Sequence, residues 1–82
     1  MQPFLGEIRL FPYNFAPVGW AACNGSLLSI EQYSNLFHLI GSAFGRDGRT
    51  TFALPDLRSS APFPPGQGTY CIAVLGTFPK QS

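Results

Sequence analysis

The stretch that most constrains the fold of this chain is residues 45–58, with the sequence GRDGRTTFALPDLR. A polar loop runs into a short apolar strand, and Pro55 ends that strand or holds it at a sheet edge. Asp47-Gly48 is a strong turn dipeptide, so we expect Gly48 at a positive φ and a loop of defined shape. The charged residues and the glycine of this stretch are the candidate ligand or interface residues: Arg46, Asp47, Gly48, Arg49, Asp56 and Arg58.

The carboxylates of this stretch are predicted to be structural rather than catalytic. Asp56 directly follows a proline, where its side chain can accept backbone N–H groups in a turn and pair with Arg49 or Arg58. An acid–base dyad of Asp47 and Asp56 is less favoured, because each has an arginine nearby. A backbone nest that binds an anion at residues 45–48 is an alternative. No nucleophile with a placed base is visible, so no catalytic residue is predicted.

The composition indicates one small domain, residues 1–82, that associates with other chains. Of its residues, 45% are hydrophobic and 15% aromatic, whereas 11% are charged. A chain of this size buries a limited share of its surface, so apolar surface is expected to stay exposed and to favour self-association. A net charge of +1 is no footprint for nucleic acid. No apolar run approaches the ~20 residues of a membrane span.

No cofactor or metal site is expected. Cys23 and Cys71 fit no zinc motif, which needs four ligands, and His38 has no second ligand-type residue at helical spacing. We expect both cysteines to be buried and reduced, with a disulfide between two strands as the alternative. The first residues, MQPFLGEIRLF, show no secretory signal, so synthesis in the cytoplasm is predicted, with a virion or extracellular particle as the final location.

Short strands alternate with turns along most of the chain. Alternating polarity and turn residues predict strands at 6–11, 20–23, 26–28, 50–54 and 70–76. Asn24-Gly25 is expected to close a tight hairpin turn between the second and third of these strands. Tyr13 and Phe15 lie in a loop between two prolines and are expected to fold back over the core. Residues 59–69 are rich in Ser, Pro and Gly and predict an extended loop.

One helix is predicted at residues 30–40. Ser29 is a suitable N-cap, and Gln32, three residues later, completes a capping box. Apolar residues recur at helical spacing and make the expected buried face: Tyr33, Leu36, Phe37 and Ile40. Gly41 is the expected C-cap. The sequence therefore predicts a loop-rich α+β fold, in which one helix packs on a small, mostly antiparallel sheet of short strands.

The last predicted strand is apolar on both faces, which is typical of a central strand or of a strand at an interface. Together with the Pro-rich loop before it, this strand supplies the candidate residues of an assembly surface: Phe63, Tyr70, Ile72 and Val74.

Three long segments of the chain carry a family resemblance: GEIRLFPYNFAPVGWAACNGSLLSI, LFHLIGSAFG and DGRTTFALPDLR. They resemble the phage tail collar domain family, which occurs in short tail fibres and in bacterial proteins described as microcystin-dependent. The ending YCIAVLGTFP is similar to that of small bacterial members. Family members usually continue LPDLR with Gly-Arg and a longer Gly-rich stretch. This chain has Ser59, Ser60 and a short Pro-rich segment there, and so resembles a shortened member.

The resemblance implies a trimeric, fibre-associated module. We therefore expect a non-enzymatic structural protein that associates with itself in a tail, a fibre or another multimeric particle. Other tail or fibre proteins and a cell-surface glycan are its further expected partners. The alternative function is a small ligand-binding adhesion module, lectin-like or anion-binding, centred on residues 46–49 and Asp56.

Overall fold

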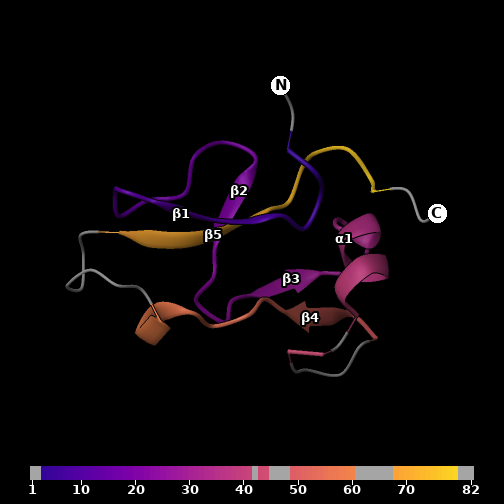
Figure 1. Cartoon of the computed structure of the whole chain (residues 1–82). Coiled ribbons are helices and arrows are strands. Elements are labelled where there is room, and N and C mark those ends of the chain that lie inside the picture. Colours follow the sequence, from indigo (N-terminus) through magenta and orange to yellow (C-terminus); the bar gives the residue numbers. More distant parts are fainter. Residues whose placement is uncertain (1–2, 42, 45–48, 61–67, 80–82) are drawn as a thin grey trace.

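The computed structural model describes residues 3–41, 43–44, 49–60 and 68–79 (Figure 1). Its elements follow the order β1 (Ile8–Phe11), β2 (Trp20–Ala22), β3 (Leu27–Ser29), α1 (Ser34–Ile40), β4 (Thr51–Ala53), the 3₁₀ turn η1 (Arg58–Ser60) and β5 (Thr69–Ala73). The strands form two antiparallel sheets, ordered β1-β5-β2 and β3-β4. The predicted α+β fold is confirmed, although the strands divide between two sheets instead of forming one.

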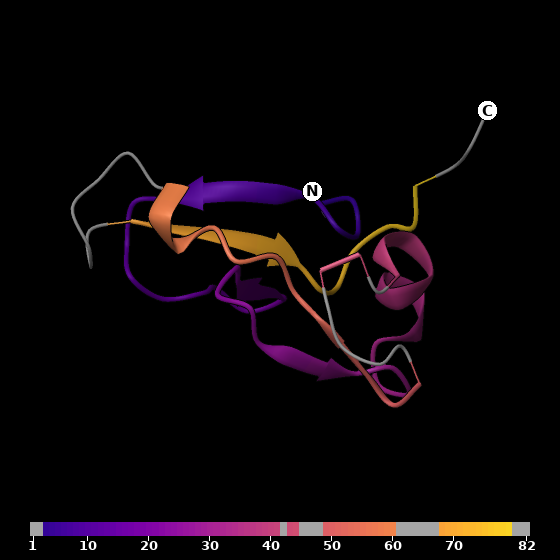
Figure 2. The ribbon, with the colours of Figure 1, turned by 90° about the horizontal axis from the view of Figure 1, so that it is seen from below.

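The last strand, β5, is central, as its two apolar faces predicted. It pairs with β1 on one side and with β2 on the other, so that Ile72 lies opposite both Ile8 and Ala21. Viewed from below, β1 and β5 run side by side in opposite directions (Figure 2). The carboxyl end of β5 lies toward α1 in both views (Figures 1 and 2).

One face of β5 packs into the main core, between the two sheets and the helix. The buried residues of this core are Leu5, Cys23, Leu36, Phe52, Leu54 and Ile72. Phe37 adds a ring contact with Phe52 at 5.4 Å between centroids. The predicted apolar helix face is confirmed, because Leu36 is buried and Tyr33, Phe37 and Ile40 pack against the core.

The other face of β5 is covered by aromatic side chains. Trp20 of β2 meets Phe11 of β1 edge to face, with the ring centroids 5.0 Å apart. The guanidinium carbon of Arg9 lies 5.7 Å from the centroid of the Trp20 ring. Because β5 lies between these two strands, the contact spans it and leaves Cys71 and Ala73 with no exposed surface.

Tyr13 and Phe15 do not fold back over the core, so that expectation was wrong. Tyr13 stacks on Phe11 at 5.6 Å, and Phe15 stacks on Tyr13 at 4.6 Å. The three rings form a row that leads outward, with Tyr13 36% and Phe15 60% exposed. Trp20 already covers this face of the sheet, which leaves the two loop aromatics to pack on one another.

The helix begins later than predicted, at Ser34 instead of residue 30. Ser29 is the last residue of β3 and pairs with Thr51, so its backbone is held in strand geometry. The chain must reverse in a turn before helical bonding can start. Part of the expected cap exists in that turn, since the Ser29 hydroxyl accepts a long hydrogen bond of 3.4 Å from the Gln32 N–H. The predicted C-cap is present, because the Gly41 N–H donates to the Phe37 carbonyl at φ +58°.

Asn24-Gly25 does not close a hairpin, so the expectation of a tight hairpin turn at this dipeptide was wrong. The strands on either side of it belong to different sheets, since β2 pairs with β5 and β3 pairs with β4. Gly25 has the positive φ expected of a turn, +79°. The dipeptide therefore turns the chain from one sheet to the other, because its flanking strands both find partners that come later in the sequence.

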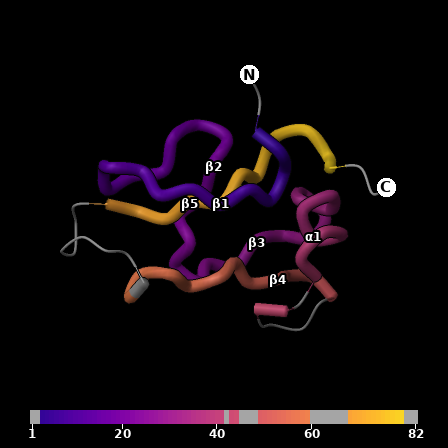
Figure 3. The backbone as a smooth tube through the Cα atoms, in the orientation of Figure 1, coloured from indigo at the N-terminus to yellow at the C-terminus, as the bar shows by residue number. Residues whose placement is uncertain are grey.

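The predicted last strand begins one residue earlier and ends at Ala73. Beyond it the chain pairs with the N-terminal segment. The Leu5 N–H donates to the Thr77 carbonyl at 2.8 Å, and the Thr77 N–H donates to the Pro3 carbonyl at 3.0 Å. The first and last described segments thus lie side by side (Figure 3).

Candidate functional site

Asp56 and Arg58 form a compact ion pair directly after β4. The Asp56 carboxylate accepts hydrogen bonds from Nε of Arg58 at 2.9 Å, from its terminal nitrogen at 2.7 Å and from its backbone N–H at 3.2 Å. The side-chain bond from Arg58 is the main cause that lowers the pKa of the Asp56 carboxyl to about 2. The side chains are 47% and 71% exposed, so the pair lies at the surface.

The backbone around Asp56 is tied to the crossover between the two sheets. The Leu57 N–H donates to the Cys23 carbonyl at 2.8 Å, and Asp56 forms an isolated antiparallel bridge with Asn24. A side chain on Gly25 would lie 3.6 Å from the Asp56 carboxylate. The ion pair therefore lies at the point where the chain passes from one sheet to the other, and the structural role of Asp56 stays a prediction.

Of the six loop candidates, the structure describes Arg49, Asp56 and Arg58. Arg49 is exposed just before β4, and Asp56 is joined to Arg58. Arg46, Asp47 and Gly48 lie outside the described residues, so the anion nest and the φ of Gly48 stay predictions.

The assembly candidates on β5 differ in their accessibility. Ile72 is 1% exposed and lies in the main core, which corrects its assignment to the chain's surface. Tyr70 and Val74 are half-buried and pack against the same core. Phe63 lies outside the described residues. The sequence of the strand is apolar on both faces, so only the packing decides which face meets the main core.

Four other large apolar side chains are exposed on the paired terminal segments and on the loop before β2, which lies beside them. We call them the terminal patch: Phe4 at 59%, Val18 at 99%, Leu75 at 63% and Phe78 at 40% exposed. The residues stand on adjacent backbone segments, because Phe4 bridges to Thr77 and the Gly19 carbonyl accepts from Leu75. Sequence reasoning missed this patch, since its members come from three segments that meet only in the fold.

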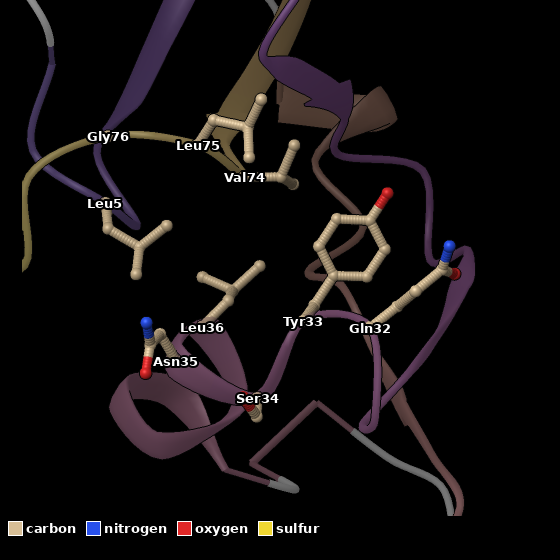
Figure 4. Close-up of a pocket in the computed structure, with 9 residues that line it drawn as sticks. All are labelled: Leu5, Gln32, Tyr33, Ser34, Asn35, Leu36, Val74, Leu75 and Gly76. Carbon is tan, nitrogen blue, oxygen red and sulfur yellow. The ribbon is translucent and has the colours of Figure 1, made fainter.

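A small cavity lies between the start of α1 and the end of β5 (Figure 4). Its volume is about 170 Å³. The apolar side chains of Leu5, Leu36 and Val74 face one another across it, and the Tyr33 ring closes one side (Figure 4). Gln32, Ser34 and Asn35 are the polar residues that line it. The cavity is large enough for a small apolar group or a few water molecules.

The two cysteines are free and buried, as predicted. Burial is the main cause that raises the pKa of the Cys23 thiol to about 11 and that also raises the pKa of Cys71. The His38 ring lies against Phe78, with centroids 5.8 Å apart. Among the described residues, no group of three potential metal ligands occurs. None of the helices in that part of the chain has the length and apolar character that a bilayer span requires.

A family model described as Phage Tail Collar Domain matches residues 6–62, which are 57 of the 82 residues. The matched stretch runs from the turn before β1 past η1 and stops before β5. Neither a curated protein nor a solved structure matches the chain. Since the family match covers more than half of the sequence, the chain belongs to the phage tail collar domain family, a family of phage tail structural modules.

Proposed function

We propose that this chain is a non-enzymatic assembly module of a phage virion, which associates with copies of itself in a tail or tail fibre. The observation that carries the proposal is the terminal patch. It exposes two phenylalanines, a leucine and a fully exposed valine on adjacent segments. Exposed apolar side chains gathered on adjacent segments are typical of interaction sites in soluble proteins.

The composition supports the same conclusion. Only 11% of the residues are charged, so few charges are available to keep isolated copies apart in solution. A trimer is the expected assembly, because the family resemblance implies one and a closed ring satisfies every copy of a head-to-tail contact.

Substitution of Val18 tests the proposal. Val18 is 99% exposed, so Val18→Glu should leave the monomer fold unchanged while it places a charge in the contact. We expect light scattering to give a mass of three chains for the parent at micromolar concentration and a smaller mass for the variant. Far-UV circular dichroism should be the same for both.

Leu27→Glu is the matched control. Leu27 is 50% exposed on β3, in the other sheet, and should keep the parent mass when substituted. A parent mass of one chain across a wide dilution range would show that the chain does not self-associate. An equal decrease in oligomer mass for both variants would show that the contact between copies does not lie at the terminal patch.

A second function, adhesion to a cell-surface glycan, has support from the row formed by Phe11, Tyr13 and Phe15. These rings stack at 4.6–5.6 Å, and the outer two are exposed. Sugar rings have apolar C–H faces that pack on aromatic faces. A glycan array should show binding that Tyr13→Ala with Phe15→Ala removes, and no binding by the parent would exclude this function.

A further inference from the structure

The central strand of the three-stranded sheet comes from outside the part of the chain that matches the family. The match ends at residue 62, and β5 begins at Thr69. β1 and β2, which both lie within the match, pair with β5 and not with each other. Without β5, the two strands would flank an open slot with unpaired backbone groups on both sides.

The slot holds β5 by backbone hydrogen bonds from both sides. On the β1 side, the Ala73 N–H donates to the Glu7 carbonyl at 2.8 Å. On the β2 side, the Cys23 N–H donates to the Tyr70 carbonyl at 2.8 Å, and the Val74 N–H donates to the Gly19 carbonyl at 2.9 Å. The strand is also enclosed by side chains, since Cys71, Ile72 and Ala73 are at most 1% exposed.

We propose that the slot between β1 and β2 is a strand-acceptor site, and that in the assembled protein it takes β5 from a neighbouring copy of this chain. This inference rests on the proposed self-association and adds a backbone contact between copies to the contact at the terminal patch. A sheet completed by a strand from another chain derives affinity from the main chain and specificity from the side chains on alternate faces. Both components are present here in the register of β5.

The contacts of β5 do not depend on which copy supplies it. The strands that pair with β5 lie far back in the sequence. The nearer of them, β2, ends at Ala22, which is 47 residues before Thr69, the first residue of β5. An exchanged strand therefore forms the same hydrogen bonds and buries the same side chains as a strand from its own chain. The balance between the two arrangements then depends on concentration, and exchange is a low-cost route to an oligomer.

Bundling of copies would remove most of the entropic cost of exchange. A neighbour's strand in a fibre would have an effective concentration in the millimolar range, comparable to that of the strand on its own chain. Each copy would give its β5 to the next and accept one from the previous copy. Such a head-to-tail exchange closes into a ring when the rotation permits, and three copies are the expected number.

A disulfide trap distinguishes the two arrangements in the full-length chain. Ala22 lies opposite Cys71. Hydrogen-bonded pairs alternate along an antiparallel ladder, and the backbone bonds of β2 to β5 fall at the odd-numbered positions Gly19 and Cys23. Ala22 and Cys71 are therefore a non-hydrogen-bonded pair, in which the two Cβ atoms are close. The test protein is Ala22→Cys with Cys23→Ala. Oxidised glutathione forms a mixed disulfide with the introduced thiol at the half-buried position 22 and releases one reduced glutathione. The neighbouring Cys71 thiol then loses its proton and displaces the second glutathione, so that the protein disulfide forms without reagent contact to the buried Cys71.

The number of chains in the covalent product reports the exchange. We expect the assembled fraction to give disulfide-linked dimers and trimers on a non-reducing gel, and reduction to return single chains. Ala21→Cys with Cys23→Ala is the matched control. Ala21 is opposite Ile72 and faces the core, so its thiol should not reach Cys71 and should give no linked species.

The outcomes separate this inference from the proposed function. If light scattering shows an oligomer but the trap gives only internally bonded single chains, the strand is not exchanged and self-association stands. If the parent has the mass of one chain at all concentrations, both are wrong. Leu10→Cys with Tyr70→Cys repeats the trap on the β1 side, in case the first variant does not fold. Linked trimers there would support exchange, and internally bonded single chains would overturn it.

Discussion

Among the glycines that the structure describes, Gly76 is the position at which the fold excludes a side chain most strictly. A Cβ at this position would lie 2.4 Å from the Pro3 carbonyl oxygen, which is backbone and cannot swing away. Gly76→Ala must therefore push apart the paired terminal segments. We expect a loss of about 2–3 kcal/mol in the free energy of unfolding, in the range of overpacked sites.

Gly41→Ala is the control for this glycine. Gly41 has φ +58° and ψ −150° but nothing within 4 Å of the added Cβ, so only this glycine-type backbone conformation opposes the change. Its expected cost is about 1–2 kcal/mol. Urea denaturation of both variants measures the difference in the free energy of unfolding. Equal decreases would show that the Pro3 backbone shifts to accommodate the added Cβ without destabilising the fold.

Asp56 should stabilise the fold in a pH-dependent way. Its pKa is about 2 in the folded chain, below the ordinary 3.8, chiefly because Arg58 bonds to the carboxylate. A group with a lowered folded pKa stabilises above its ordinary pKa, and the effect is lost as the pH falls toward the folded value. Asp56→Asn should thus melt below the parent at pH 7 and approach it near pH 2.

The exposed position of the pair limits the size of that effect. Glu31→Gln removes another exposed carboxylate and controls for the loss of one negative charge. A gap between parent and Asp56→Asn melting points that does not change with pH would argue against the ion pair as its cause.

At the scale of the element, β5 depends on the aromatic cover above it. Trp20→Ala removes the ring that meets Phe11 across the strand and uncovers Cys71 and Ala73. We expect a loss of about 2–3 kcal/mol, below the ~3–5 kcal/mol of a fully buried ring, because Trp20 is half-buried.

Circular dichroism in denaturant is the suitable measurement, since the variant has no tryptophan left to fluoresce. Phe15→Ala is the control, because the Phe15 ring is 60% exposed at the outer end of the row and should cost less than about 1 kcal/mol. Similar losses in the two variants would mean that the whole row, and not its inner ring, stabilises the sheet.

At the scale of the whole molecule, the two thiols report global unfolding. Cys23 is 2% exposed in the main core, and Cys71 has no exposed surface on the other face of the sheet. Because the thiolate is the reactive form, the raised pKa values slow both groups further. Alkylation at pH 8 should be negligible in buffer and complete for both cysteines in denaturant.

The labelling rates also test whether the chain unfolds as one unit. If the sheet and the core open together, both cysteines should label at the same rate at each intermediate denaturant concentration. Rapid labelling of Cys71 alone, in buffer, would show that β5 or its cover opens independently.

The sequence by itself determined the local structure of this protein. Alternating polarity located the strands, apolar spacing located the buried face of α1, and Gly41 marked the end of the helix. The pairing of Asp56 was also local, because Arg58 is two residues away. Such features depend on neighbours within a few residues, so a single sequence contains them.

Only the tertiary structure decided which distant segments meet. The partners of β2 and β3 follow much later in the chain, so the turn at Asn24-Gly25 could not show that it links two sheets. Pairing of Ser29 with β4 delayed the helix, and the central place of β5 buried Ile72. The terminal patch arose in the same way. In each case the free energy comes from burial and hydrogen bonds between residues far apart in sequence, which local propensity does not contain.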